Sequence, residues 1–498
     1  MPATAPKETL VVGSGAAGLT VALLLAKAGR RVTLLETQSG IGGYLRRFTR
    51  NGLRFDTGFH FTGGFGDTLS QILTILGLEN DIKAEPLRSR IYLQETGRML
   101  TLPGGSLGER AEYLAAVFPE DASAIRNYFQ LEQDIVASTP LFDLSNADQP
   151  IAPQLSLYDS ITLQEYFQQQ RFSSPEVETV LGMMVFCHGT PPSEIPLAQH
   201  CRISCGLHQH LSRVEHGGDA FIRAFKRELE RYQVKTRTGT SIAKMLRFSS
   251  DCQCQEVLLS NAETLAVEDI FFAVHPEVYL QLFPAEMLSP SLRRRYGKSQ
   301  DTCSFFSIYA ALDDELAAEP ELLQYISCND LNRLLSPGDS AYGTGMVTNL
   351  ETDHRGRVRK TFTAFRNMHL SEVTAQCGPE LGSYSSNPRY LEFKRRISEQ
   401  VYQDVLKVYP HYDRHLHILA SATPYTCRRY SPPRGSAYGL KIKIAESRLS
   451  GQLPVRNCYA LGHHAIMPGI LGTMLGAFLT FRQAVGAEAY RALIRQAL

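Results

Sequence analysis

The sequence contains no tryptophan and has no cysteine before position 187. Any aromatic wall around a ligand must therefore be built from its 24 Phe and 22 Tyr residues. Ten cysteines in 498 residues are far fewer than a disulfide-stabilised scaffold carries. The first residues also lack a basic segment followed by an apolar one. We therefore expect no secretory signal, reduced thiols and a cytoplasmic location.

The chain has no excess charge of either sign, since 51 Lys and Arg residues balance 50 Asp and Glu residues. A near-neutral chain lacks the basic surface of dedicated nucleic-acid-binding proteins, so we expect no nucleic-acid partner. Hydrophobic residues make up 43% and charged residues 20%, a globular balance that excludes wholesale disorder. The length exceeds that of one simple domain.

One long run without Asp, Glu, Lys or Arg covers residues 459–481. A membrane-spanning helix needs about 20 mainly apolar residues. Pro468 and Gly469 interrupt this run, which leaves an apolar helix of about 13 residues after the break. We expect a buried loop followed by a buried helix, and not a membrane span.

The strongest local pattern is a glycine-rich turn near the N-terminus. Residues 9–12 suit an apolar strand, residues 17–27 an apolar helix and residues 31–36 a second strand. The turn between the first strand and the helix reads Gly13-Ser14-Gly15-Ala16-Ala17-Gly18. It matches G-x-G-x-x-G in the strand–turn–helix context that dinucleotide-binding domains require.

Each residue of this motif has a physical task in binding a dinucleotide. Gly13 permits the tight turn, Gly15 lets a pyrophosphate approach the backbone, and Gly18 allows close helix–strand packing. The N-terminus of the following helix supplies amide donors and the positive end of a dipole. Glu36, 18 positions after Gly18, can accept hydrogen bonds from a ribose and disfavours a 2′-phosphate. These residues do not distinguish between NAD and FAD as the bound dinucleotide.

Further segments resemble a known group of FAD enzymes. They are residues 36–43 (ETQSGIGG), 52–58 (GLRFDTG), 217–221 (GGDAF), 272–276 (FAVHP), 422–439, 459–462 (YALG) and 468–473 (PGILGT). Together they resemble the amine oxidase and phytoene desaturase superfamily, and most of all its branch of phytoene desaturases, carotenoid cis–trans isomerases and retinol saturases. The matching segments extend from about residue 8 to residue 486.

The resemblance implies an α/β fold with two discontinuous domains. Residues 1–75, 210–295 and 445–498 would form a Rossmann-like FAD-binding domain. Residues 76–209 and 296–444 would form a substrate-binding domain with a mixed sheet and helices. The implied FAD-binding residues are Gly13, Gly15, Ala16, Gly18, Glu36, Gly42, Gly43, Arg46, Gly462, Gly469 and Gly472. Arg46 could neutralise flavin phosphate, contact acidic lipid headgroups or simply face solvent.

The resemblance also implies an oxidoreductase that acts on carbon–carbon bonds of a long, apolar, unsaturated lipid or isoprenoid, such as a carotenoid. Desaturation would proceed by hydride transfer to flavin N5. The alternatives are reductive saturation or cis–trans isomerisation of a polyene, a lipid carrier without redox activity, and an amine oxidase with a polar substrate. The electron acceptor stays open.

Histidines are the candidates for proton transfer beside the flavin. His60 lies between two phenylalanines, and His463 is followed by a second histidine, His464. Either site could relay a proton or stabilise developing charge, because imidazole titrates near neutral pH. Each ring could instead only hydrogen-bond the backbone of a buried turn. His463 also stands where members of the branch often carry an acidic residue, which puts their usual contact to the flavin's ribityl or phosphate portion in question.

A cluster of possible metal ligands is interpreted differently. His200, Cys201, Cys205, His208 and His210 lie within eleven residues, but their spacing does not match a zinc site. We expect no metal and a cavity-lining role. Helices within residues 107–136 could contact a membrane peripherally, although their charges are mixed.

Overall fold

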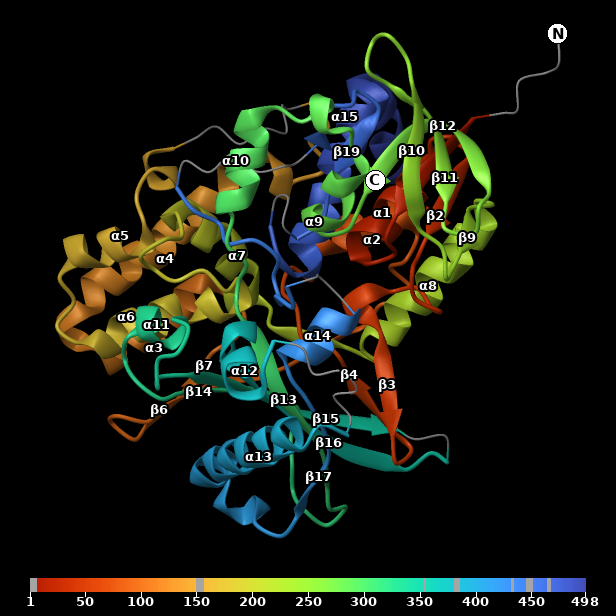
Figure 1. The fold of residues 1–498 in the computed structure, drawn as a ribbon. Helices are drawn as coiled ribbons and strands as arrows, with labels where there is room; N and C mark the ends of the chain where they lie inside the picture. The colour runs from red at the N-terminus through yellow and green to blue at the C-terminus, as the bar shows by residue number, and fades with distance from the viewer. Residues whose placement is uncertain are drawn as a thin grey trace, which may run out of the picture.

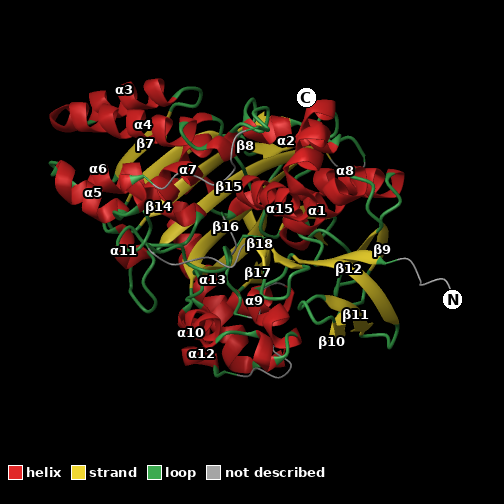
Figure 2. Cartoon of the chain, turned by 90° about the horizontal axis from the view of Figure 1, so that it is seen from above, coloured by secondary structure: helices red, strands yellow, loops and turns green. Residues whose placement is uncertain are grey.

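The computed structural model describes residues 7–148, 156–352, 355–379, 386–430, 434–444, 451–463 and 467–498. Two large sheets organise these residues, one of eight strands and one of seven. Figures 1 and 2 show the two sheets with helices packed around each of them.

The eight-stranded sheet has a parallel centre. Its parallel strands run in the order β9 (Lys235–Arg237), β2 (Val32–Leu35), β1 (Glu8–Val12), β12 (Thr264–Phe272) and β19 (Cys458–Ala460). The antiparallel strands β10 (Ile242–Phe248) and β11 (Cys254–Leu259) extend it from the first half of β12, and β18 (Gly451–Gln452) pairs with β19. Strands β1 and β2 are buried at every position, as apolar strands covered on both faces should be.

Helices cover the parallel strands. They are α1 (Ala16–Lys27), α2 (Thr68–Leu76), α8 (Gly218–Arg231) and α15 (Gly469–Ala497). One apolar cluster joins Leu23 of α1, Phe225 of α8 and Phe478 of α15 to the sheet. The β-α-β unit expected from the sequence is therefore present, with boundaries that differ by no more than one residue.

The seven-stranded sheet is mixed. Its order is β17 (Leu416–Ala422), β13 (Ser304–Leu312), β16 (Val358–Met368), β15 (Gly343–Thr352), β14 (Glu321–Ile326), β6 (Arg88–Leu93) and β7 (Arg98–Leu102). Only the β14–β6 pair is parallel. Helix α13 (Pro388–Val408) covers one face and contributes Phe393, Ile397 and Val401 to the shared core.

A helical layer packs on the opposite face at the β6–β7 end of this sheet. It contains α3 (Leu107–Val117), α4 (Ala122–Ala137), α5 (Leu163–Gln170), α6 (Pro175–Gly182) and α7 (Leu197–Gln209). The stretch expected to be helical over residues 107–136 is two helices, because Pro119 begins a separate short turn between them. Ser106 and Glu109 cap the first of these helices reciprocally.

Short elements connect the two sheets. The hairpin of β3 (Arg47–Arg50) and β4 (Leu53–Asp56) packs Phe48 and Phe55 against Tyr309 of β13. The other short elements are β5 (Ala84–Pro86), β8 (Ser212–Val214), α9 (Pro276–Tyr279), α10 (Pro290–Lys298), α11 (Leu331–Leu334), α12 (Leu370–Cys377) and α14 (Pro424–Tyr430).

The C-terminal helix α15 is longer than the sequence predicts. It has 29 residues and kinks at Gly486, whose φ of +85° lies outside the helical region. It is long and apolar enough to cross a membrane, but 56% of its most apolar 18-residue window is buried inside the protein. The expectation of a buried helix is thus met, whereas the expected length of about 13 residues is wrong because the helix continues beyond its apolar part.

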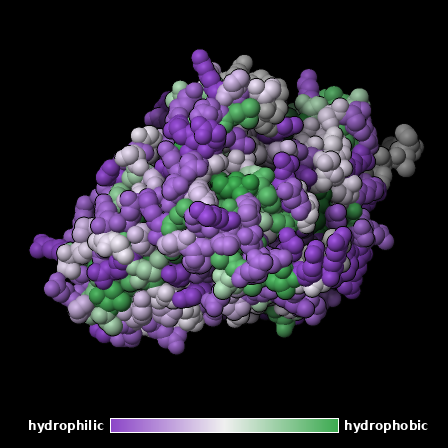
Figure 3. All heavy atoms as spheres, turned by 90° about the horizontal axis from the view of Figure 1, so that it is seen from below, coloured by the Kyte–Doolittle hydropathy of each residue, from purple (hydrophilic) through white to green (hydrophobic). Residues whose placement is uncertain are grey.

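These layers confirm the predicted α/β fold class, with mixed sheets and many helices. The division into two domains at the stated boundaries stays a prediction. Figure 3 shows one face of the molecule on which an apolar area is surrounded by polar side chains. The large hydrophobic side chains with the most exposed surface among the described residues include Leu157, Val358, Tyr430 and Leu498.

Candidate cofactor and substrate site

The turn after β1 lies at the carboxyl edge of the parallel strands. Gly13 has a φ of +95°, and a Cβ there would come within 2.6 Å of Val274 Cγ1. A Cβ on Gly18 would lie 1.9 Å from the Gly13 carbonyl oxygen. A Cβ on Gly15 would meet no other atom within 4 Å. Packing therefore requires Gly13 and Gly18, whereas Gly15 keeps its surface open in front of the helix.

The N-terminus of α1 is suited to an anion. The helix begins at Ala16, its N-cap is Gly15, and its first turn contains no acidic residue and no capping side chain. Amide groups of a first helical turn have no partner within their helix, and the helix dipole favours negative charge there. A pyrophosphate is the ligand that this arrangement fits.

Glu36 is held beside the same turn. Its Oε2 accepts hydrogen bonds from the Ser14 amide at 3.1 Å and the Ser14 hydroxyl at 2.5 Å. Its Oε1 accepts from the Gln38 amide at 2.8 Å. A carboxylate offers about four acceptor sites, so the fixed side chain can still accept from a ribose.

The second glycine pair contacts the first motif directly. Gly43 has a φ of +53°, and a Cβ there would lie 3.0 Å from Gly15 Cα. The Gly42 amide donates to the Ser14 carbonyl at 3.0 Å. The half-buried Arg46 follows, with its carbonyl accepting from Thr57 Oγ1 at 2.6 Å. The two motifs, separated by about one βαβ unit in sequence, form one cradle of bare backbone.

The C-terminal segment reaches the same edge of the sheet. The Leu461 amide after β19 donates to the Phe272 carbonyl at 3.0 Å, and the neighbouring Gly462 has a φ of +119°. Helix α15 then begins at Gly469, again without a capping side chain or an acidic residue in its first turn. A Cβ on Gly472 would lie 2.5 Å from Met467 Cβ, so this turn tolerates only glycine.

His463 lies beside Tyr44, with 6.4 Å between the ring centroids. Burial, and to a lesser extent His275, lowers the pKa of His463 to about 4, although Asp301 opposes the shift. The ring is therefore neutral at pH 7. His464 lies outside the described residues.

Two further residues complete the surroundings of His463. The buried His275 accepts from the Glu277 amide at 3.2 Å, and its Nε2 lies 3.2 Å from an Asp301 carboxylate oxygen. Sequence analysis named neither as a site residue. The segment 272–276 could have pointed to His275, whereas Asp301 is brought to the site only by the tertiary fold.

A narrow cavity lies on one face of the seven-stranded sheet. The sheet contributes residues from β13 to β16, and the opposite wall is formed by Phe61, Phe186, Cys187 and Tyr438. Most of the lining is aromatic or aliphatic. The aromatic part of this lining consists of phenylalanine and tyrosine rings, as expected for a chain without tryptophan.

His60 lies beside the cavity. Its ring stacks on Phe365, with centroids 4.7 Å apart and an interplanar angle of 7°. Phe365 lines the cavity and also contacts Phe305 edge-on. Burial, and to a lesser extent the positive charge of Arg47, lowers the pKa of His60 to about 4. His60 is therefore a neutral imidazole at the edge of an apolar cavity.

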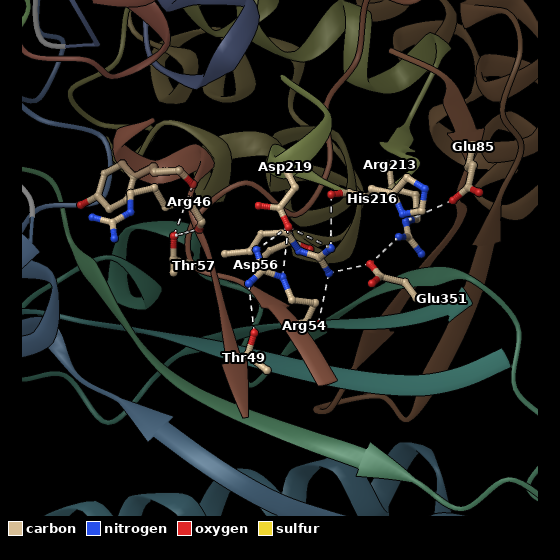
Figure 4. A network of polar contacts seen from close by, with 12 residues as sticks. Arg46, Thr49, Arg54, Asp56, Thr57, Glu85, Arg213, His216, Asp219 and Glu351 are labelled. Atoms are coloured by element: carbon tan, nitrogen blue, oxygen red, sulfur yellow. Dashed lines mark hydrogen bonds and ion pairs between the residues drawn. The ribbon is translucent and has the colours of Figure 1, made fainter. Parts of the chain in front are cut away.

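Arg47 ties the β3–β4 hairpin to both sheets. Its guanidinium lies 3.0 Å from an Asp56 oxygen and 2.5 Å from an oxygen of Glu351 on β15. Arg213 of β8 also binds Glu351, at 3.0 Å. Figure 4 shows Asp56, Arg213 and Glu351 of this network converging from separate segments. Burial raises the pKa of Asp56 to about 6, although Arg47 opposes this shift.

The histidines of α7 form a separate buried network. His200 Nδ1 lies 3.0 Å from His188 Nε2, and His208 Nδ1 lies 2.9 Å from a Glu132 oxygen. Within the described ranges, no group of three or more His, Cys, Asp or Glu side chains could hold a metal ion. His200 and His208 are buried inside the helical layer, and neither is among the residues that line the cavity described above.

This network predicts acid sensitivity. Burial lowers the pKa of His188 to about 3. Below pH 6.5 the unfolded chain takes up a proton that the folded protein does not, so stability falls as the pH decreases toward 3. His188 contributes up to about 1.4 kcal/mol per pH unit to the slope of the unfolding free energy against pH. The His188→Gln variant should lose this contribution. Guanidinium titrations between pH 7 and pH 5 measure the slope. His210→Gln, at the exposed end of α7, is the control, and an unchanged slope in His188→Gln would contradict the assignment.

Known proteins share these features. A family of NAD(P)-binding Rossmann-like domains matches residues 11–76, which contain both glycine motifs and Glu36. The chain is 24% identical to all-trans-retinol 13,14-reductase of Homo sapiens, over 95% of this chain and 84% of that protein. It is 26% identical to the chloroplastic prolycopene isomerase of Daucus carota, over 29% of this chain and 24% of that protein.

Solved structures share the fold. An oxidoreductase from Methanosarcina mazei superimposes with a TM-score of 0.63 at 15% identity, and the match covers 95% of this chain and 99% of that chain. Together with the sequence relatives, this similarity confirms the resemblance and the fold class that the sequence indicates.

Proposed function

Because this chain belongs to the carotenoid and retinol saturase branch of the amine oxidase-like flavoproteins, we propose that it is an FAD-dependent oxidoreductase. Its substrate would be a long, apolar, unsaturated lipid or isoprenoid, and the reaction would take place at a carbon–carbon bond. The observation that carries this proposal is the arrangement of the site. The turn after β1 is bare backbone that fits a pyrophosphate, and His60 stacks on a ring that lines an aromatic cavity.

The residues of the cradle fit FAD. Gly15 and Gly43 would admit the pyrophosphate to the backbone, and Ala16 would present the first amides of α1. Glu36 would accept from the adenosine ribose. The uncapped N-terminus of α15, at Gly469, would offer a second set of amides. Arg46, Gly462 and Gly472 stay proposed members of this site.

Bound FAD supplies hydride-transfer chemistry at its N5 position, which no side chain can carry out. The chain's own contribution is to bind, to orient and to exclude water. Phe61, Phe305 and Phe365 would hold an extended polyene by apolar contact. Desaturation is the direction we propose, and saturation or cis–trans isomerisation of a polyene would use the same site.

His60 is the proposed proton-transfer residue. Its neutral imidazole can accept a proton at one nitrogen and donate at the other. Stacking on Phe365 fixes the plane of the ring at the cavity border. His463, neutral for the same physical reason and near Tyr44, is the second candidate.

Replacing His60 tests this assignment. The His60→Phe variant preserves an aromatic ring that can stack on Phe365 but removes proton transfer, which contributes about 100- to 10,000-fold in enzymes. We expect normal FAD content and a fall in turnover of at least about 100-fold. Because the pKa of His60 is about 4, the wild-type rate should not change through this group between pH 8 and pH 6. His216→Phe, at a largely exposed position, is the control, and full activity in His60→Phe would exclude the catalytic role.

Two measurements test the proposed function itself. The visible absorption spectrum of the purified protein, with analysis of the supernatant after denaturation, should reveal released FAD. Anaerobic mixing with a polyene should then bleach the flavin band if the direction is desaturation. A protein that neither contains nor takes up FAD would contradict the proposal and favour a lipid carrier.

A peripheral contact with a membrane would suit such a substrate, because an apolar polyene resides in lipid. The apolar area on the face in Figure 3 is one surface that could make this contact. Sedimentation with liposomes, with and without acidic lipid, measures it directly. A protein that stays in the supernatant under both conditions would take up its substrate by another route.

A further inference from the structure

The floor of the cavity contains one amide side chain that faces it. Along β14, Leu322 packs in the apolar cluster with Val347 and Phe365, and Ile326 packs in the cluster of the helical layer. Leu323 and Tyr325 pack on the opposite face, against α13. Because side chains alternate along a strand, Gln324 shares the cavity face with Leu322 and Ile326.

The amide oxygen of Gln324 has no hydrogen-bond partner in the described part of the chain. The residue is only 5% exposed. Its neighbours across the strands are Gly345 on β15 and Ile91 on β6, neither of which has a polar side chain. A buried acceptor without a donor costs about 1–3 kcal/mol. This position therefore carries a polar group that the protein's own packing leaves unsatisfied.

Two glycines of β15, Gly345 opposite Gln324 and Gly343 opposite Ile326, bring aromatic rings onto this part of the sheet. A Cβ on Gly345 would lie 2.3 Å from the Phe365 ring, and a Cβ on Gly343 would lie 2.4 Å from the Phe186 ring. The two rings therefore lie directly on the backbone of β15. They leave Gln324 as an amide among aromatic and aliphatic surfaces, where water cannot replace a missing partner at low cost.

We propose that Gln324 determines specificity by accepting a hydrogen bond from a hydroxyl group on an otherwise apolar polyene. The inference rests on the proposed function and refines its substrate class to polyene alcohols. A hydroxyl supplies the donor that the amide oxygen lacks, whereas a hydrocarbon leaves it unsatisfied. Sites built to pair with a substrate hydroxyl discriminate strongly against analogues that lack it.

The test compares two ligands on the FAD-loaded protein. The probes are all-trans-retinol and the hydrocarbon in which hydrogen replaces its hydroxyl group, and polyene fluorescence gives both dissociation constants. Wild type should bind the alcohol at least about 10-fold more tightly, equivalent to about 1.4 kcal/mol. In Gln324→Met the preference for the alcohol should fall below about 2-fold, because a thioether accepts hydrogen bonds only weakly. The affinity for the hydrocarbon should be retained, because the thioether replaces the volume of the amide.

A matched control lies two residues away on the same strand and face. Leu322→Met changes a side chain that lines the cavity without removing a polar group, and it should keep the wild-type preference. The melting temperature of Gln324→Met should equal or exceed that of wild type, because an unsatisfied buried amide is removed.

The outcomes separate the two proposals. Equal affinities of a flavin-loaded, polyene-converting wild type for the two probes would overturn the role of Gln324 alone. A persistent preference in Gln324→Met would do the same. A protein without FAD, or one that binds neither probe, would contradict the proposed function and this inference together.

Discussion

Gly15→Val should abolish FAD binding while leaving the fold intact. A side chain at this position meets no protein atom within 4 Å of its Cβ, and its φ of −66° is accessible to valine. The apoprotein should therefore fold normally. The same side chain would fill the space through which a pyrophosphate approaches the backbone and the first amides of α1. We expect an affinity loss of at least about 100-fold, or about 2.7 kcal/mol.

Flavin absorbance after purification, followed by titration of the apoprotein with FAD, measures this loss. Gly104→Val is the matched control, because a Cβ on the exposed Gly104 would likewise meet no atom within 4 Å. It lies before α3, outside the cradle, so its flavin content should equal that of wild type. Normal FAD binding by a folded Gly15→Val protein would show that the cofactor does not use this turn.

Arg47→Met should produce the largest loss of stability. The Arg47 side chain is 2% exposed and neutralises two carboxylates, those of Asp56 and Glu351. Removing one partner of a buried ion pair leaves charge without compensation and costs about 3–5 kcal/mol. Since Arg47 also lowers the pKa of His60, the variant should in addition raise that pKa. Guanidinium unfolding measures the first effect, and the His60 ring resonances in an NMR titration measure the second.

Arg54 on the same hairpin provides the control. Its side chain is 40% exposed and pairs with Asp219. Exposed ion pairs contribute about 0–1 kcal/mol, so Arg54→Met should change stability by no more than about 1 kcal/mol. If both variants lose equal stability, the loss in Arg47→Met comes from general damage to the hairpin and not from the buried Arg47 network.

The local parts of the site could be predicted from the sequence. Gly13, Gly15, Gly18 and Glu36 lie within one β-α-β unit, where the spacing of strand, turn and helix fixes their relative positions. The structure places them as this pattern requires, with Glu36 hydrogen-bonded to Ser14. Assignment of Gly42 and Gly43 needed the resemblance to a family, because their contact with Gly15 follows from the path of an irregular loop.

Other parts depend on contacts between distant segments. Arg47 and Glu351 are 304 positions apart, and no local pattern indicates that they form an ion pair. Gln324 reads as an ordinary polar position in a strand, and only the sheet order puts it opposite glycine on a cavity face. The length of α15 was misjudged for a related reason. Packing against α1 buries its first half, but a helix continues wherever its backbone hydrogen bonds do, and its polar second half gives no apolar signal.

By itself, the sequence determined the α/β class, the β-α-β unit with its glycine turn, and the family resemblance. These features follow from periodicity and from backbone conformations that only glycine adopts readily, and both act over short distances along the chain. The tertiary structure alone decided which residues surround His60 and His463, how charge is neutralised at the hairpin, and which polar atom faces the cavity. Burial sets those properties, because it removes water from a charge or an amide and leaves only the groups that folding brings into contact.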